Sequence, residues 1–185
     1  RGPDRLEVEV GPGGPVGDFD VPSGGDGAWE TTTVGGRSCL RPTEASYYLY
    51  AVLPEAFRRR AAGGLWVEVE YFGARHGEFR LQYASTDRVE PWEGLYKAAE
   101  QRWQPEATGL RRFRRALFHL PAFDPGRAQN LGASFRLEFR RELLVSRLAV
   151  SLAPPPDLDE FPALAPLPEL RKMPGRFYPI NYLFV

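Results

Sequence analysis

Hydrophobic and polar side chains alternate in four segments of the chain, with the period of two that is typical of β-strands buried on one face. In LWVEVEY (65–71) the apolar side chains share one face, whereas Glu68 and Glu70 lie on the other. The same alternation recurs in EFRLQY (78–83), SFRLEFR (134–140) and LLVSRLAVSL (143–152), where Ser146 interrupts a face formed by Leu144, Leu148, Val150 and Leu152. We therefore predict four strands whose apolar faces share a common core.

A fifth strand is predicted in RRFRRALFHL (111–120), but its pattern permits two different buried faces. One face contains Ala116, Phe118 and Leu120, and the other contains Phe113, Leu117 and His119. The arginines of this segment alternate between the two faces, so neither face gathers their full charge. The segment is therefore a weak indication of a polyanion site.

The connections between these segments favour antiparallel sheets. Residues 73–77 form a short loop between two predicted strands, which is consistent with an antiparallel hairpin. Helices are indicated only in residues 54–62 and 93–103, and both are short single helices rather than the crossovers that parallel strands need. We predict an all-β fold, an antiparallel β-sandwich of the jelly-roll type.

A proline-rich tail follows the last predicted strand. Residues 154–185 hold eight of the 18 prolines, a density that blocks both helices and central strands. The tail is also rich in large apolar side chains from Phe161 onward, which a flexible linker would lack. We predict a β-sandwich domain in residues 1–153 and an extended tail in residues 154–185, which packs on the sandwich or leads to a partner or further domain.

Charge and hydropathy give no support for nucleic acid or a membrane as a partner. The 24 basic and 24 acidic residues give a formal net charge of +0, so the long-range field that attracts polyanions is missing. The apolar runs are far shorter than the roughly 20 residues of a membrane span, and RGPDRLEVEV lacks the layout of a signal peptide. The chain as given is expected to be soluble and unanchored.

Few residues are available for catalysis. Cys39 is the single cysteine, His76 and His119 are the only histidines, and the common nucleophile, phosphate-loop and zinc motifs are absent. Glycosidases need only two carboxylates, and the 24 acidic residues leave that chemistry open by number. A sandwich of this size has little room for a deep cleft, however, so we expect a domain that is not itself an enzyme.

Residues 27–152 resemble a known family of domains through VEVEYFGARHGEFRLQYAS (67–85), LRRFRRALFHLPAF (110–123), GRAQNLGASFRLEF (126–139) and LLVSRLAVSL (143–152). The pattern is similar to the galactose-binding-like jelly-roll domains attached to bacterial glycoside hydrolases. Gly73, Ala84 and Ser134 stand where such domains often carry aspartate. The resemblance implies a carbohydrate-binding or accessory module without catalytic activity, within a secreted, extracellular bacterial protein that acts on glycans.

Residues 87–109 are the richest place for the aromatic rings that stack on sugars. Trp92 lies between proline and glycine at an expected loop tip, with Tyr96 and Trp103 further along. The alternative is that this insertion folds back and covers a sheet edge, which we favour for Trp103. Trp29 and Trp66 are expected to be packing residues.

Arg127, Gln129 and Asn130 form a polar loop before a strand, in a place similar to sugar-contacting loops of the family; ordinary turn chemistry explains them equally well.

The family also often carries a structural calcium ion. The candidates for this calcium site are four carboxylates of the glycine-rich loop: Asp18, Asp20, Asp26 and Glu30.

The expected partner is a polysaccharide or oligosaccharide. The alternative is a structural or interaction domain that docks a catalytic domain or partner chain.

Overall fold

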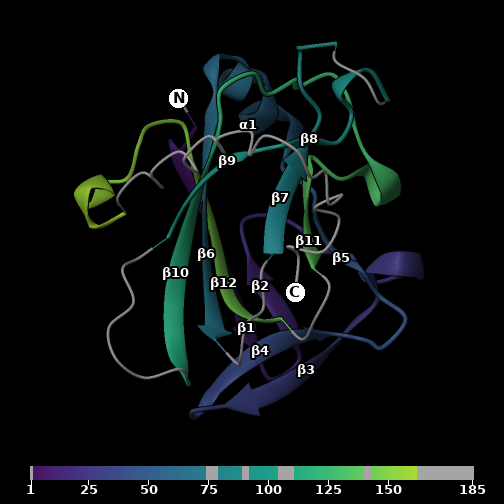
Figure 1. Ribbon diagram of the computed structural model, residues 1–185, viewed down its shortest axis with the longest axis vertical. Coiled ribbons are helices and arrows are strands. Elements are labelled where there is room, and N and C mark those ends of the chain that lie inside the picture. The colour runs from purple at the N-terminus through teal and green to yellow at the C-terminus, as the bar shows by residue number, and fades with distance from the viewer. Residues whose placement is uncertain (1, 74–78, 89–91, 104–110, 140–142, 162–185) are drawn as a thin grey trace, which may run out of the picture.

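Two antiparallel β-sheets packed face to face form the protein (Figure 1). The structure is a computed structural model that describes residues 2–73, 79–88, 92–103, 111–139 and 143–161. In this part of the chain the larger sheet has eight strands and the smaller sheet has four. The prediction of an all-β antiparallel sandwich is confirmed.

The larger sheet has the strand order β2-β1-β12-β6-β10-β9, and a β3–β4 hairpin joins it through β12. Its strands are β1 (Arg5–Gly11), β2 (Gly14–Gly17), β3 (Trp29–Val34), β4 (Arg37–Pro42), β6 (Leu65–Gly73), β9 (Glu100–Trp103), β10 (Arg112–Leu120) and β12 (Leu144–Ser151). The smaller sheet has the order β5-β11-β7-β8. Its strands are β5 (Tyr48–Ala51), β7 (Phe79–Tyr83), β8 (Lys97–Ala98) and β11 (Phe135–Phe139).

The core lies between the sheets and uses the apolar faces that the alternation predicted. The inward side chains of β6, β7 and β11 are buried; they are Leu65, Val67, Val69, Tyr71, Phe79, Leu81, Tyr83, Phe135, Leu137 and Phe139. In β10 the structure selects the first of the two predicted faces, Ala116, Phe118 and Leu120. Leu117 is also buried, but it lies on the outer side of the sheet opposite Glu68.

A β-bulge in β12 corrects one predicted face. The register of β12 against β6 shifts between Val145 and Arg147, around the interrupting Ser146. Because a bulge adds one residue to a strand, the alternation changes phase there. Val145 and Leu148 therefore both join the core, whereas Leu144 pairs with Phe72 outside it, contrary to the prediction that placed Leu144 with Leu148.

The predicted hairpin between residues 65–71 and 78–83 is wrong. β6 pairs with β10 and β12 in the larger sheet, while β7 pairs with β11 and β8 in the smaller one. The chain therefore passes from one sheet to the other between Gly73 and Phe79. Turn residues indicate where a chain reverses, but they do not decide which neighbour a strand pairs with.

One of the two predicted helices is confirmed and the other is wrong. Helix α1 (Glu55–Arg60) and the 3-10 turn η2 (Ala61–Gly63) cover residues 55–63, one residue later than the predicted 54–62. Residues 93–103 instead form part of the 3-10 turn η3 (Trp92–Gly94) and the strands β8 and β9. β8 pairs with β7 and β9 with β10, so pairing at the edges of both sheets overrides the local preference for helix.

The first eight residues of the predicted tail, 154–161, pack on the larger sheet. Phe161 is fully buried after the 3-10 turn η5 (Leu158–Glu160), and the guanidinium of Arg115 in β10 lies 4.9 Å from the centre of its ring. Arg115 also pairs with Asp157 at 2.6 Å and with Glu160 at 3.2 Å. The rest of the predicted tail, residues 162–185, lies outside the described residues.

Glu68 lies beneath this segment on the outer face of the larger sheet and is only 4% exposed. Its carboxylate pairs with Arg147, with Arg115 at 3.6 Å and with Arg5 at 3.9 Å. The alternation correctly placed Glu68 away from the core, but it gave no sign that arginines would enclose it.

None of the helices in the described part of the chain has the length and apolar character needed to cross a membrane.

Candidate functional site

Two loops that are distant in sequence come together at one end of the smaller sheet; we call residues 92–96 and 127–132 the loop pair. Arg127 donates from Nη1 to the carbonyl of Glu93 at 2.7 Å and from Nη2 to the carbonyl of Trp92 at 3.4 Å. Gln129 donates to the carbonyl of Leu95 at 2.8 Å. The structure thus brings the predicted aromatic segment against the predicted polar loop.

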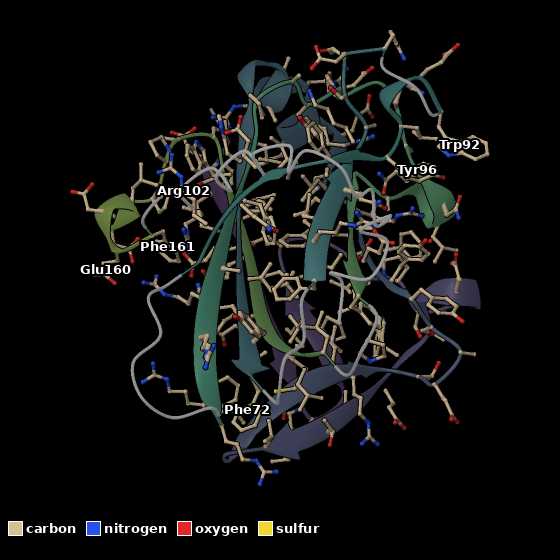
Figure 2. All side chains as sticks on the ribbon, viewed as in Figure 1. Phe72, Trp92, Tyr96, Arg102, Glu160 and Phe161 are labelled. Carbon is tan, nitrogen blue, oxygen red and sulfur yellow. The ribbon has the colours of Figure 1, made fainter. Side chains whose placement is uncertain are left out.

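Trp92 is the most exposed large ring of this site, with 68% of its surface accessible (Figure 2). Leu131, in the 3-10 turn η4 (Asn130–Gly132), is 48% exposed. Burial of apolar surface is favourable, so exposed large apolar side chains on an ordered loop indicate a contact surface. Such a surface suits a ligand with an apolar face.

The backbone of the loop pair is strained. Trp92, Glu93 and Leu131 have φ values of 64°, 50° and 58°, and they are the non-glycine residues with positive φ in the described part of the chain. The left-handed conformation costs an L-residue about 1–2 kcal/mol. Residues held in strained conformations cluster at functional sites, and all three lie in this loop pair.

Tyr96 links the loop pair to the outer face of the smaller sheet. Its hydroxyl donates to Oδ1 of Asn130 at 3.3 Å, and its ring centre lies 4.0 Å from the guanidinium carbon of Arg136 in β11. The same guanidinium lies 3.8 Å from the ring centre of Tyr48, and its Nε donates to Gln82 at 2.7 Å. One face of the Tyr96 ring is therefore occupied by Arg136.

Arg136, Tyr48 and Gln82 were not among the predicted site residues. They occupy outward positions on three neighbouring strands, β11, β5 and β7. The alternation of these strands was a signal that could have placed them on one surface. It could not show that the Tyr96 loop would fold over them.

Asn130 also connects the loop pair to the 3-10 turn η1 (Gly25–Gly27). Its Nδ2 donates to the hydroxyl of Tyr50 at 3.5 Å, and this hydroxyl donates to Oδ1 of Asp26 at 2.9 Å. Burial and the hydrogen bond to Asp26 raise the pKa of the Tyr50 hydroxyl above its usual value of 10.0. The phenol therefore stays protonated and remains a donor at neutral pH.

The four carboxylates predicted to bind calcium have different partners. Asp18 accepts a hydrogen bond from the backbone nitrogen of Glu7 at 2.9 Å, and Asp26 accepts the hydroxyl of Tyr50. Glu30 accepts from Nε of Arg41 at 2.9 Å. Within the described residues, no three His, Cys, Asp or Glu side chains gather in a group that could hold a metal ion.

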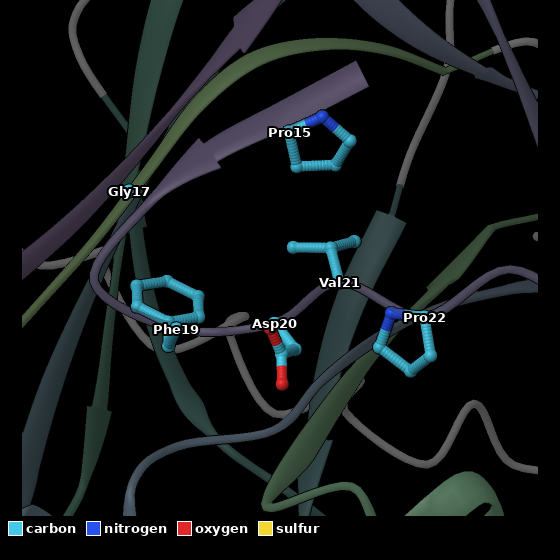
Figure 3. Close-up of a pocket in the computed structure, with 6 residues that line it drawn as sticks. All are labelled: Pro15, Gly17, Phe19, Asp20, Val21 and Pro22. Carbon is cyan, nitrogen blue, oxygen red and sulfur yellow. The ribbon is translucent and has the colours of Figure 1, made fainter. Parts of the chain in front are cut away.

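Asp20, the fourth of these carboxylates, lines an open cavity of about 370 Å³ beside β2 (Figure 3). The other residues that line the cavity are Pro15, Gly17, Phe19, Val21 and Pro22. Calcium is bound by six to eight oxygen atoms, usually with more than one carboxylate. Among the residues that line this cavity, the single carboxylate of Asp20 does not supply such a set.

The remaining tryptophans lie away from the loop pair. Trp103 is in β9 opposite Ala116, so its backbone forms part of a sheet edge; its side chain lies outside the described structure. Trp29 packs against the core and donates from Nε1 to the carbonyl of Val21 at 3.2 Å, which confirms it as a packing residue. Trp66 stacks on His119 with ring centres 4.2 Å apart, on the outer face of the larger sheet.

Comparison with known proteins finds no matching family model, no matching curated protein and no matching solved structure. The function is therefore inferred from the geometry of the loop pair.

Proposed function

We propose that this chain is a non-catalytic carbohydrate-binding or accessory module whose ligand site is the loop pair. The observation that supports the proposal best is the position of Trp92, which is 68% exposed while its carbonyl and that of Glu93 are held by Arg127. A flat, exposed ring on a fixed backbone offers the surface on which the apolar face of a pyranose stacks. We call the ring of Trp92 the platform. Because the backbone that carries the ring is already held, less ordering entropy is lost on binding than on a free loop.

The polar groups beside Trp92 divide into two roles. Asn130 is exposed, and each of its amide atoms forms one hydrogen bond, with Tyr96 and with Tyr50. Its second N–H and the second lone pair of its oxygen can still hydrogen-bond sugar hydroxyls beside the Trp92 ring. Arg127 and Gln129 are instead engaged with backbone carbonyls of the facing loop. They are positioning residues in this proposal, which revises the ligand-contacting role that the sequence suggested for them.

The two-sheet architecture and the resemblance to galactose-binding-like domains support the same proposal. In such a protein the module would hold a catalytic domain near its polysaccharide, and the whole protein would be secreted by a bacterium. Stacking by one ring and a few hydrogen bonds corresponds to weak binding, with dissociation constants from about micromolar to millimolar. A structural calcium ion is not needed for this platform.

The experiment is affinity electrophoresis of the full chain against a panel of plant and bacterial polysaccharides, with and without calcium. Trp92→Ala should weaken binding at least about tenfold without lowering the melting temperature, since an exposed ring adds little to the core. Val16→Ala is the control, because Val16 is 72% exposed on the larger sheet and outside the site. Equal binding by wild type and Trp92→Ala would contradict the proposal.

A second candidate function uses the same exposed side chains. Trp92 and Leu131 would also suit a protein surface, as in an interaction domain that docks a catalytic domain or partner chain. If wild-type protein binds no polysaccharide of the panel, the carbohydrate proposal fails and this alternative takes its place. The direct measurement would then be cross-linking from position 131 to the docked catalytic domain or partner chain.

A further inference from the structure

We propose that the loop pair selects neutral glycans and discriminates against glycans that carry carboxylate or sulfate groups. This inference rests on the proposed function and adds the charge class of the ligand. Two observations support it: the described cations around the platform already have partners, and an exposed carboxylate without a described side-chain partner stands next to Trp92.

Arg127 is hydrogen-bonded directly to the backbone that carries Trp92, and both of its terminal nitrogens, Nη1 and Nη2, form these bonds. It donates to the carbonyls of Glu93 and Trp92 in the facing loop. These bonds hold two residues whose backbone is left-handed, with φ values of 50° and 64°. Two of its five N–H groups are thus committed to the facing loop, so the guanidinium is held in one orientation and cannot turn to follow an anionic sugar without losing the contacts that position Trp92.

The neighbouring cations are also engaged. Lys97 forms an ion pair with Asp87, and Arg88 pairs with Asp124 at 3.5 Å. Arg136 is only 7% exposed, and it lies against the rings of Tyr48 and Tyr96. Recruiting Arg136 for a ligand anion would expose a buried guanidinium, which is unfavourable. Recruiting Lys97 or Arg88 would exchange one carboxylate partner for another, which gains little because exposed ion pairs contribute only about 0–1 kcal/mol.

Glu93 supplies the repulsive part of the selection. Its side chain is exposed, and within the described structure its carboxylate forms no hydrogen bond or ion pair; only its backbone carbonyl is held. A negative charge beside the platform disfavours any ligand that brings negative charge to Trp92. A polymer with an acidic group on each sugar would meet this charge in every binding register.

The test compares one polysaccharide with its own anionic derivative. The neutral polymer that wild-type protein binds in the panel is converted into its carboxymethyl form, and both are titrated calorimetrically at low ionic strength. The carboxymethyl form should bind at least about tenfold more weakly, and the gap should shrink at about 1 M salt, where charges are screened within about 3 Å.

Glu93→Gln should narrow the gap between the two polymers by about fivefold, because it removes the repelling charge. Glu9→Gln is the matched control, since it makes the same change in net charge on β1 of the other sheet and should leave the gap as in wild type. The inference is overturned if the anionic polymer binds as tightly as the neutral one through Trp92, or if salt and Glu93→Gln leave the gap unchanged. Failure to bind any neutral polymer would instead overturn the proposed function itself.

Discussion

Replacing Leu131 by glycine should make the protein more stable than replacing it by alanine. Leu131 has φ 58° and ψ 19° in the turn η4, and its side chain is 48% exposed. Alanine keeps the unfavourable left-handed backbone, whereas glycine adopts it freely. The comparison of the two variants therefore isolates the backbone strain from the loss of the leucine side chain.

The expected difference is the balance of two effects. Relief of the left-handed strain stabilises the glycine variant by about 1–2 kcal/mol. The greater freedom of glycine in the unfolded chain costs about 0.5–1 kcal/mol. The glycine variant should thus exceed the alanine variant by up to about 1.5 kcal/mol in the free energy of unfolding, and by about 0.8 kcal/mol at the middle of both ranges, which corresponds to a few degrees at most in melting temperature.

Equilibrium urea unfolding of wild type and both variants measures this difference. Val16 provides the control pair, because it lies in the strand β2 and is not among the residues with positive φ. There the order should reverse, with the glycine variant less stable than the alanine variant by about 0.5–1 kcal/mol. If the glycine variant at position 131 is also the less stable one, the loop pair stores no strain and its link to function loses that support.

Two further predictions concern the rest of the molecule. Phe161→Ala should lower the free energy of unfolding by about 3–5 kcal/mol, because it empties a fully buried site beside Arg115; a change below about 1 kcal/mol in urea unfolding would show that residues 154–161 are dispensable. For Glu70, burial raises the pKa, but hydrogen bonds from Ser146 and Arg37 and the charges of Arg37 and Arg147 outweigh it and leave the pKa below its usual 4.5. Since the pKa is lower in the folded state, this carboxylate stabilises the protein above pH 4.5 and loses that contribution as the pH falls through its folded pKa. Acid titration of stability should therefore be shallower in Glu70→Gln than in wild type, and identical slopes would contradict this reasoning.

Alternation of side chains was sufficient to predict the inward faces of β6, β7 and β11, because each of these strands has one face in a common core. It did not predict the bulge at Ser146, since an inserted residue changes the phase without an obvious signal in the sequence. It also missed the crossing of the chain between Gly73 and Phe79, because strand partners are chosen by packing across the whole sandwich. Local patterns describe each strand by itself, and pairing is a property of the assembled sheets.

The sequence identified residues of the candidate site, but it did not show which contacts they form with one another. Residue type and flanking proline and glycine indicated Trp92, and turn composition indicated the loop that contains Arg127. That Arg127 holds the carbonyls of Trp92 and Glu93 depends on a contact across 34 residues of sequence, which no local pattern encodes. The carboxylates from Asp18 to Glu30 show the converse: they are close in sequence, yet Asp26 and Glu30 point to different partners.

The pairing of β1 with β12 has a consequence for how the domain folds. Arg5 lies opposite Ser151 and Glu9 opposite Arg147, so a central ladder of the larger sheet joins the two ends of the sandwich. Closing a loop of that length costs entropy before any of its contacts is gained, and folds dominated by such distant pairs form slowly. During synthesis β1 must wait, with one edge of its backbone unpaired, until β12 has left the ribosome. The emerging chain is therefore most open to aggregation in that interval, and a chaperone present at that time would raise its yield more than one added after synthesis.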